Sequence, residues 1–220
     1  MRYSKDHKAE THARIVKNAS VRLREKGSAG IGVAELMKEA GLTHGGFYAH
    51  FDSRDALIAE AFSYAMDGIA RRWRRRADSA PEGKQLDAIV NSYLTTQHRD
   101  DVGNGCMLPA LGAEVARADP KTRKAFAARL EEMIDLIAGE VPGLPPKAAR
   151  QRAMAIIATM MGSLLLSRAT GTGDLSNDLI EAGRQSALAL GKPAGTGDKK
   201  SAAKAKPSSR ASVRTPAKSP

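Results

Sequence analysis

The chain has 220 residues, enough for one large domain or two small ones, and only 4% of them are aromatic. Its single cysteine, Cys106, excludes an intrachain disulfide and fits a reducing compartment. The net charge is +11, but residues from Lys192 onward carry +7 of it, so the basic character belongs to the C-terminal tail. The polar N-terminus shows no signal peptide, and the longest near-apolar run, 153–167, is shorter than the roughly 20 residues that span a bilayer. We therefore expect a cytoplasmic protein without membrane association.

Helical periodicity dominates the first eighty residues, and no strand-like alternation persists. The apolar spacing predicts helices over about 11–26, 33–40, a short stretch after Thr43, and about 54–76. Gly27 and Gly41 are placed to end the first two helices. The Thr43 hydroxyl is expected to cap the third helix, and Asp52 or Ser53 the fourth.

The second half of the chain is also predicted to be helical. Apolar positions predict helices over about 86–97, 107–118, 120–138, 148–169 and 177–190. The helix over 148–169 is apolar nearly all round, which predicts burial on every side. In 191–220, Lys, Ala, Ser and Pro replace Leu and Ile, so we expect a disordered basic tail. The predicted fold is all-α: a three-helix N-terminal unit, a helical bundle and this tail.

The stretch GLTHGGFYAHF, residues 41–51, suits three kinds of site to different degrees. His44 and His50 are six residues apart, on different helical faces, and no other metal-binding side chain lies nearby at ligand spacing; this disfavours a metal site. A phosphate loop requires a strand before its glycines, and none is predicted here. A short helix, a tight turn and a second short helix instead predict a helix-turn-helix over about 32–51.

Each residue type in this stretch has a use on DNA. Gly45 and Gly46 lack side chains, so backbone amides near the helix N-terminus can approach a phosphate closely. Phe47 and Phe51, four apart, are expected to anchor the opposite face in the core. The side chains expected to supply hydrogen bonds to phosphates or base edges are those of Thr43, His44, Tyr48, His50 and Arg54.

Three motifs follow one another in this region: Ala40-Gly41-Leu42, Tyr48-Ala49-His50-Phe51 and Ser53-Arg54-Asp55-Ala56-Leu57. Their order and spacing resemble the DNA-binding domain of the TetR (TetR/AcrR-like) family of transcriptional regulators. The resemblance implies that DNA is faced by Thr43, His44, Gly45 and Gly46, and that phosphates are met by Tyr48, His50 and Arg54. It also implies a DNA-binding domain over 8–68, and an effector-binding and dimerisation domain over 69–190 whose last two helices form a homodimer interface.

Three departures from the family pattern are expected to matter locally. Leu23 stands where the family often has Phe, which predicts a smaller apolar contribution from the first helix. Gly32 stands where the family often has a capping Thr or Ser, so we expect weaker capping at the N-terminus of the second helix. Arg22 occupies a usually apolar position, which predicts a thinner apolar face on the first helix.

Effector and sensor residues are harder to infer. Cys106 precedes a predicted helix, where thiolate is favoured, so it is either a redox or electrophile sensor or a small buried residue. Adaptable Met side chains suit a pocket for a small apolar effector, and the candidate lining is Cys106, Met107, Met133 and Met160. The run Arg71–Arg76 is either a nucleic-acid patch or a solvated helix end.

The sequence predicts a sequence-specific transcriptional regulator, a repressor that a small apolar effector releases from a pseudo-palindromic operator in double-stranded DNA. The alternative is a non-specific DNA-organising protein whose basic tail releases counterions from phosphates. We find no nucleophile–base pair, metal cluster or cofactor loop in the sequence, so we expect neither an enzyme nor a bound cofactor.

Overall fold

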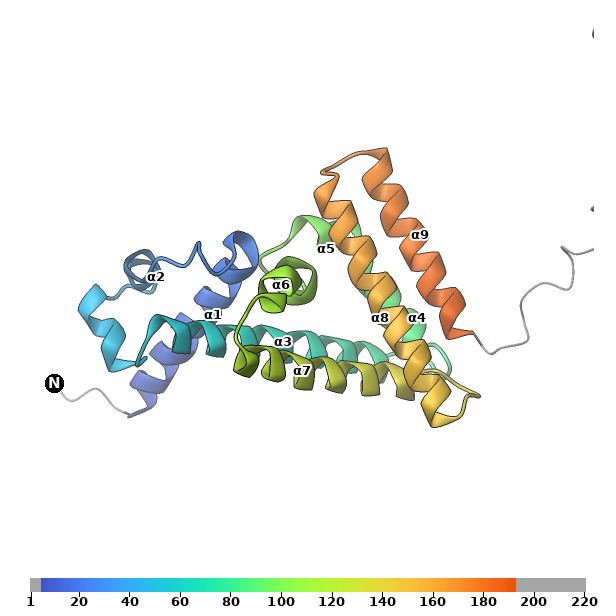
Figure 1. Ribbon diagram of the computed structural model, residues 1–220, viewed down its shortest axis with the longest axis horizontal. Coiled ribbons are helices and arrows are strands. Elements are labelled where there is room, and N and C mark those ends of the chain that lie inside the picture. The colour runs from blue at the N-terminus through green and yellow to red at the C-terminus, as the bar shows by residue number, and fades with distance from the viewer. Residues whose placement is uncertain (1–4, 193–220) are drawn as a thin grey trace, which may run out of the picture.

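A computed structural model describes residues 5–192, and within this range the chain is all-α, without strands (Figure 1). The elements are α1 (Lys5–Lys26), α2 (Val33–Glu39), the 3₁₀ helix η1 (His44–Ala49), α3 (Arg54–Asp78), α4 (Gln85–Tyr93), α5 (Thr96–Asp100), α6 (Met107–Ala116), α7 (Pro120–Gly139), α8 (Pro146–Ala169) and α9 (Asp174–Gly191). The predicted all-α fold is confirmed. The sequence predicts disorder for the tail, and its residues 193–220 lie outside the described range.

The N-terminal unit packs α1, α2 and η1 against the first half of α3 (Figure 1). Phe47 and Phe51 are buried and their ring centroids lie 5.5 Å apart, so both anchor η1 as predicted. Gly27 and Gly41 end α1 and α2 with φ of +71° and +72°, a left-handed conformation that glycine adopts without steric cost.

Arg22 joins α1 to α2 by electrostatic contacts where the sequence predicted only a thinner apolar face. Its guanidinium donates to both carboxylate oxygens of Glu39 and, over 3.1 Å, to Glu35. The Arg22 side chain is largely buried while both acids remain half exposed. This pairing also fixes α2, whose N-cap residue Gly32 offers no side chain to cap it.

Helix α3 runs without a break across the predicted domain boundary at residue 68 and connects the two halves of the molecule (Figure 1). Ser53 caps it as expected, because its hydroxyl accepts the Ala56 N–H over 3.0 Å. Helix α7 lies along α3, while α6 lies between the N-terminal unit and α8. Helices α8 and α9 form an antiparallel pair at the far end.

Three local predictions were wrong. The helix expected over 86–97 breaks after Tyr93, because Thr95 caps a new helix, α5, by accepting the His98 N–H over 3.1 Å. Thr43 precedes η1 but makes no side-chain capping hydrogen bond. Helix α8 is not buried on every side, since Leu165 and Leu166 are 48% and 52% exposed.

Helix α8 is also longer than the apolar run counted in the sequence. Its 24 residues make it, within the described range, the one helix long and apolar enough to cross a membrane by length and composition alone. The core helix of a soluble protein meets the same criterion, so α8 is weak evidence for membrane insertion.

Candidate nucleic-acid interface

One edge of η1 faces solvent because Phe47 holds the opposite edge in the core. Thr43, His44 and Gly45 are exposed, and Tyr48 is 70% exposed. The Tyr48 ring stands edge-on to Phe47 with centroids 5.3 Å apart, which directs it away from the core. These residues form a continuous polar edge on the surface of the N-terminal unit.

Packing does not require glycine at the two positions in η1. A Cβ at Gly45 would meet no atom within 4 Å, and one at Gly46 would lie 3.7 Å from Met37 and Thr43, an ordinary contact distance. Neither residue has a left-handed φ. The missing side chains therefore leave the backbone open on the solvent side, as close approach of a phosphate requires.

Arg54 already has partners within the protein. Its Nε donates to the Ile31 carbonyl over 3.1 Å and its Nη2 to the Ser28 carbonyl, so it fixes the loop between α1 and α2 to the start of α3. The side chain is still 40% exposed. Arg54 therefore has a positioning role that the sequence did not indicate, and its contact with phosphate stays a prediction.

His50 is partly buried beside α1. Its Nδ1 is buried and has no hydrogen-bond partner within the described part of the chain, and burial, followed by the charges of His12 and Lys8, lowers its pKa. The His12 ring stacks on Phe51 at 4.5 Å and its Nε2 lies 2.6 Å from a Glu60 carboxylate oxygen. His50 is thus a neutral imidazole at neutral pH, and a phosphate contact from it stays a prediction.

The four residues expected to line an effector pocket lie in the core instead. Cys106, Met107, Met133 and Met160 are each at most 1% exposed, and none lines the five cavities found. Burial raises the pKa of the Cys106 thiol, which opposes the thiolate that a sensor needs. These side chains fill space because they are apolar, so the geometry favours other residues for a ligand.

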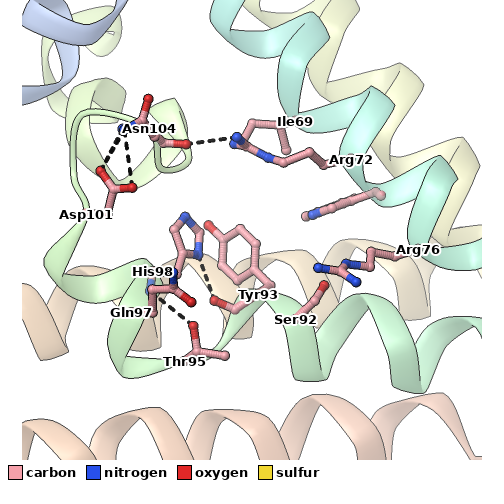
Figure 2. A pocket seen from close by; sticks show the side chains of 11 residues that line it. Ile69, Arg72, Arg76, Ser92, Tyr93, Thr95, Gln97, His98, Asp101 and Asn104 are labelled. Atoms are coloured by element: carbon pink, nitrogen blue, oxygen red, sulfur yellow. Dashed lines mark hydrogen bonds between the residues drawn. The ribbon is translucent and has the colours of Figure 1, made fainter.

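Two cavities are relevant to an effector. The first, of about 250 Å³, lies between α3, α4, α5 and the loop after α5 (Figure 2). The second, of about 380 Å³, separates α1 and the start of α3 from α6 and α7. Arg72, Trp73 and Arg76 line the first cavity; the Trp73 side chain is buried, while the arginines of the run 71–76 are exposed. Its helical spacing was the signal available in the sequence, since positions 72, 73 and 76 share one face.

Family models match both halves of the chain. Residues 15–61 match the model for bacterial regulatory proteins of the tetR family. Residues 83–181 match the model for the C-terminal domain of LmrA/YxaF-like transcriptional regulators. The first match contains η1 and its polar edge, and the second contains most of the bundle.

Individual proteins agree with the family models. An uncharacterized HTH-type transcriptional regulator of Mycobacterium tuberculosis is 27% identical over 164 residues, covering 70% of this chain and 82% of the relative. A TetR regulator from Chloroflexus aurantiacus has a similar fold, with a TM-score of 0.72 at 23% identity over 84% of this chain and 95% of that one. Reduced NemR from Escherichia coli also has a similar fold, with a TM-score of 0.67 at 21% identity over 81% of this chain and 95% of NemR. The chain therefore belongs to the TetR family of transcriptional regulators, which are DNA-binding proteins and not enzymes.

Proposed function

We propose that this regulator is a cytoplasmic repressor that binds a pseudo-palindromic operator as a homodimer and is released by a small-molecule effector. The observation that carries the proposal is the solvent-facing edge of η1, where Thr43, His44 and Tyr48 stand beside an open glycine backbone. Side chains supply contacts to bases and phosphates, while the open backbone admits a phosphate.

A dimer is expected because η1 is short and reads few base pairs. Two copies related by a two-fold axis present two such segments to successive major grooves, which explains an operator with two half-sites. With glycine at 45 and 46, few side chains are left to distinguish bases, so His44 and the shape of the DNA carry more of the sequence preference.

The exposed apolar face of the α8–α9 pair is the proposed dimer interface. On α8, Met154, Leu165 and Leu166 are between 42% and 52% exposed, and Leu175 on α9 is 62% exposed. Large apolar side chains gathered on one pair of helices are typical of an interface between subunits. A four-helix contact between two copies would bury them.

The test is footprinting of the purified full-length protein on the DNA upstream of its own gene. We expect one protected region containing two inverted half-sites about one or more helical turns apart. A titration against random DNA of equal length should give binding weaker by a factor of roughly 10³ or more at physiological salt. Equal affinity for both DNAs with a steep salt dependence would instead favour the non-specific DNA-organising protein.

A further inference from the structure

We propose that the cavity between α3, α4 and the loop of residues 101–106 binds a small aromatic carboxylate, whose charge is held by Arg72 and Arg76 of α3 and whose ring contacts Trp73 of the same helix and Tyr93 of α4. This inference rests on the proposed function, because it names the chemical class of the effector. It replaces the apolar effector expected from the methionines.

Within the described part of the chain, the two arginines of this cavity form no close ion pair, and Asp101 acts on Arg72 only at longer range. Arg72 donates from Nη1 to the Asn104 carbonyl over 2.9 Å, and neither Arg72 nor Arg76 forms an ion pair within residues 5–192 (Figure 2). Asp101, the acid on the cavity wall, accepts hydrogen bonds from the backbone and side chain of Asn104 over 3.0 to 3.2 Å. Two guanidiniums one helical turn apart are therefore left for a carboxylate from solution.

Two further guanidiniums approach the same loop, and they bind backbone instead of acids. Arg24 donates to the Gly103 carbonyl over 2.5 Å, and Arg168 donates to the carbonyls of His98 and Arg99 over 2.8 and 3.1 Å. Partial desolvation lowers the pKa of Arg24, Arg72 and Arg168, because it disfavours each charge, although the Arg72 side chain also reaches solvent. Asp101 and Glu25 offset part of this charge, but Arg24, Arg72, Arg76 and Arg168 outnumber them around the loop, so an anion would reduce the remaining positive charge.

The remaining wall suits a flat apolar body. Trp73 and Tyr93 are both buried, with ring centroids 5.8 Å apart in an edge-on arrangement, and Ile69 lies beside them. Aromatic walls of this kind accept another ring by stacked or edge contacts. The volume of about 250 Å³ lies below the roughly 300–1,000 Å³ typical of drug-sized ligands, so the occupant is small.

His98 contributes neither charge nor a free nitrogen to the cavity. Its Nδ1 lies 2.7 Å from the Tyr93 carbonyl (Figure 2). Its Nε2 accepts the Cys106 N–H over 2.8 Å. These partners fix the neutral tautomer with hydrogen on Nδ1. Recognition of the carboxylate therefore depends on the two arginines.

The loop also connects the cavity to the DNA-binding half. Asn104 is bound to Arg72 of α3, and the neighbouring Gly103 is bound to Arg24 of α1. A carboxylate that draws the Arg72 guanidinium toward itself competes with the Asn104 carbonyl and shifts the loop relative to α1. Ligand binding and operator binding are coupled if the two loop positions differ in ligand affinity.

Calorimetric titration of the full-length protein with benzoate tests the inference, with benzamide as the uncharged probe of nearly equal shape. We expect benzoate to bind at least tenfold more tightly than benzamide, since hydrogen bonds between charged groups are stronger than those of a neutral amide. Arg76→Gln should weaken benzoate binding roughly 10- to 100-fold. Arg74→Gln removes the same charge from an exposed position of the same helix that lines none of the five cavities, and it should leave benzoate binding unchanged.

Equal binding of benzoate and benzamide, no benzoate binding at millimolar concentration, or equal losses in the two variants would overturn the inference. Operator affinity is measured on the same samples with and without saturating benzoate, and a decrease supports the coupling while no change overturns it. Failure of the ligand-free protein to bind operator contradicts the proposed function. Operator binding without benzoate binding contradicts this inference alone.

Discussion

Gly46 is the residue at which the DNA-binding proposal is most directly tested. The position has room for a side chain in the free protein, so a substitution there changes the surface offered to DNA and little else. We expect Gly46→Glu to keep the helical circular dichroism and the dimer, and to lose operator affinity by more than about 100-fold, because a carboxylate is brought against phosphate.

Gly139→Glu is the matched control for this variant. Gly139 ends α7 and is exposed, and a Cβ at this position would meet no atom within 4 Å, so the same change occurs far from the recognition edge. It should bind operator like the unmodified protein. Operator affinity retained by Gly46→Glu would refute the placement of DNA at this edge.

His98 gives the protein a pH-dependent stability. Burial lowers its pKa from the ordinary 6.5 to about 4, so the unfolded chain takes up a proton before the folded one as the pH falls. Its contribution to the free energy of unfolding is complete above pH 6.5 and is lost as the pH falls toward 4, by roughly 3 kcal/mol in total.

Urea unfolding at several pH values between 7 and 4 measures this loss. His98→Gln lowers stability at every pH, because hydrogen bonds to Tyr93 and Cys106 are disturbed, but its curve should fall less steeply with decreasing pH. The lowered pKa of His50 contributes a slope of the same sign to both proteins. Parallel curves for the two proteins would show that His98 does not titrate in this window.

At the scale of elements, the proposed dimer interface on the α8–α9 pair predicts how a substitution there changes the oligomeric state. The exposed residues Met154, Ala158 and Leu165 of α8 recur at helical spacing along one stripe, and the exposed Leu166 borders it. Leu166→Glu places a charge in the proposed interface, where it would be buried without a partner. We expect the mass measured by light scattering to halve. Operator affinity should fall about 100-fold or more, because each monomer then binds a single half-site on its own.

Ala127→Glu provides the comparison for this prediction. Ala127 is an exposed position of α7, so the variant adds the same charge to a helix outside the proposed interface. It should remain dimeric. A Leu166→Glu protein that keeps the dimer mass would exclude this face as the interface.

At the scale of the whole molecule, a series of contacts joins α6 to the DNA-binding half. The Glu114 carboxylate accepts the Ser28 N–H over 3.0 Å, and the Ser28 carbonyl accepts from Arg54 at the start of α3. One residue of the α1–α2 loop is thus held by the bundle on one side and by α3 on the other. We therefore expect a movement of α6 to change the position of the α1–α2 loop and, through Arg54, of the start of α3.

Glu114→Ala should loosen this junction without unfolding either half. We expect the amide of Ser28 to exchange its hydrogen faster in the variant, because its acceptor is gone. Glu114→Gln keeps a carbonyl oxygen in the same place and should give intermediate exchange. Exchange rates at Ser28 that are equal in all three proteins would show that the contact does not hold the loop in solution.

Much of the fold could be predicted because its signals are local. Gly27 and Gly41 end helices through their own backbone conformations, and Ser53 caps α3 through a residue three positions away. The order of motifs from Ala40 to Leu57 likewise indicated the family before any packing was known. The local capping preference of threonine gave a wrong prediction at Thr43, because the short η1 begins there without a side-chain capping hydrogen bond.

The sequence by itself determined most of the helices and the family, because each depends on residues a few positions apart. The tertiary structure decided which partners the polar side chains meet. Arg54 contacts carbonyls 23 and 26 residues away, and Glu114 contacts an amide 86 residues away. It also decided that Cys106 fills the core while Arg72 lines a cavity. The physical reason is that burial and charge pairing depend on which helices pack together, and helical periodicity alone does not specify that packing.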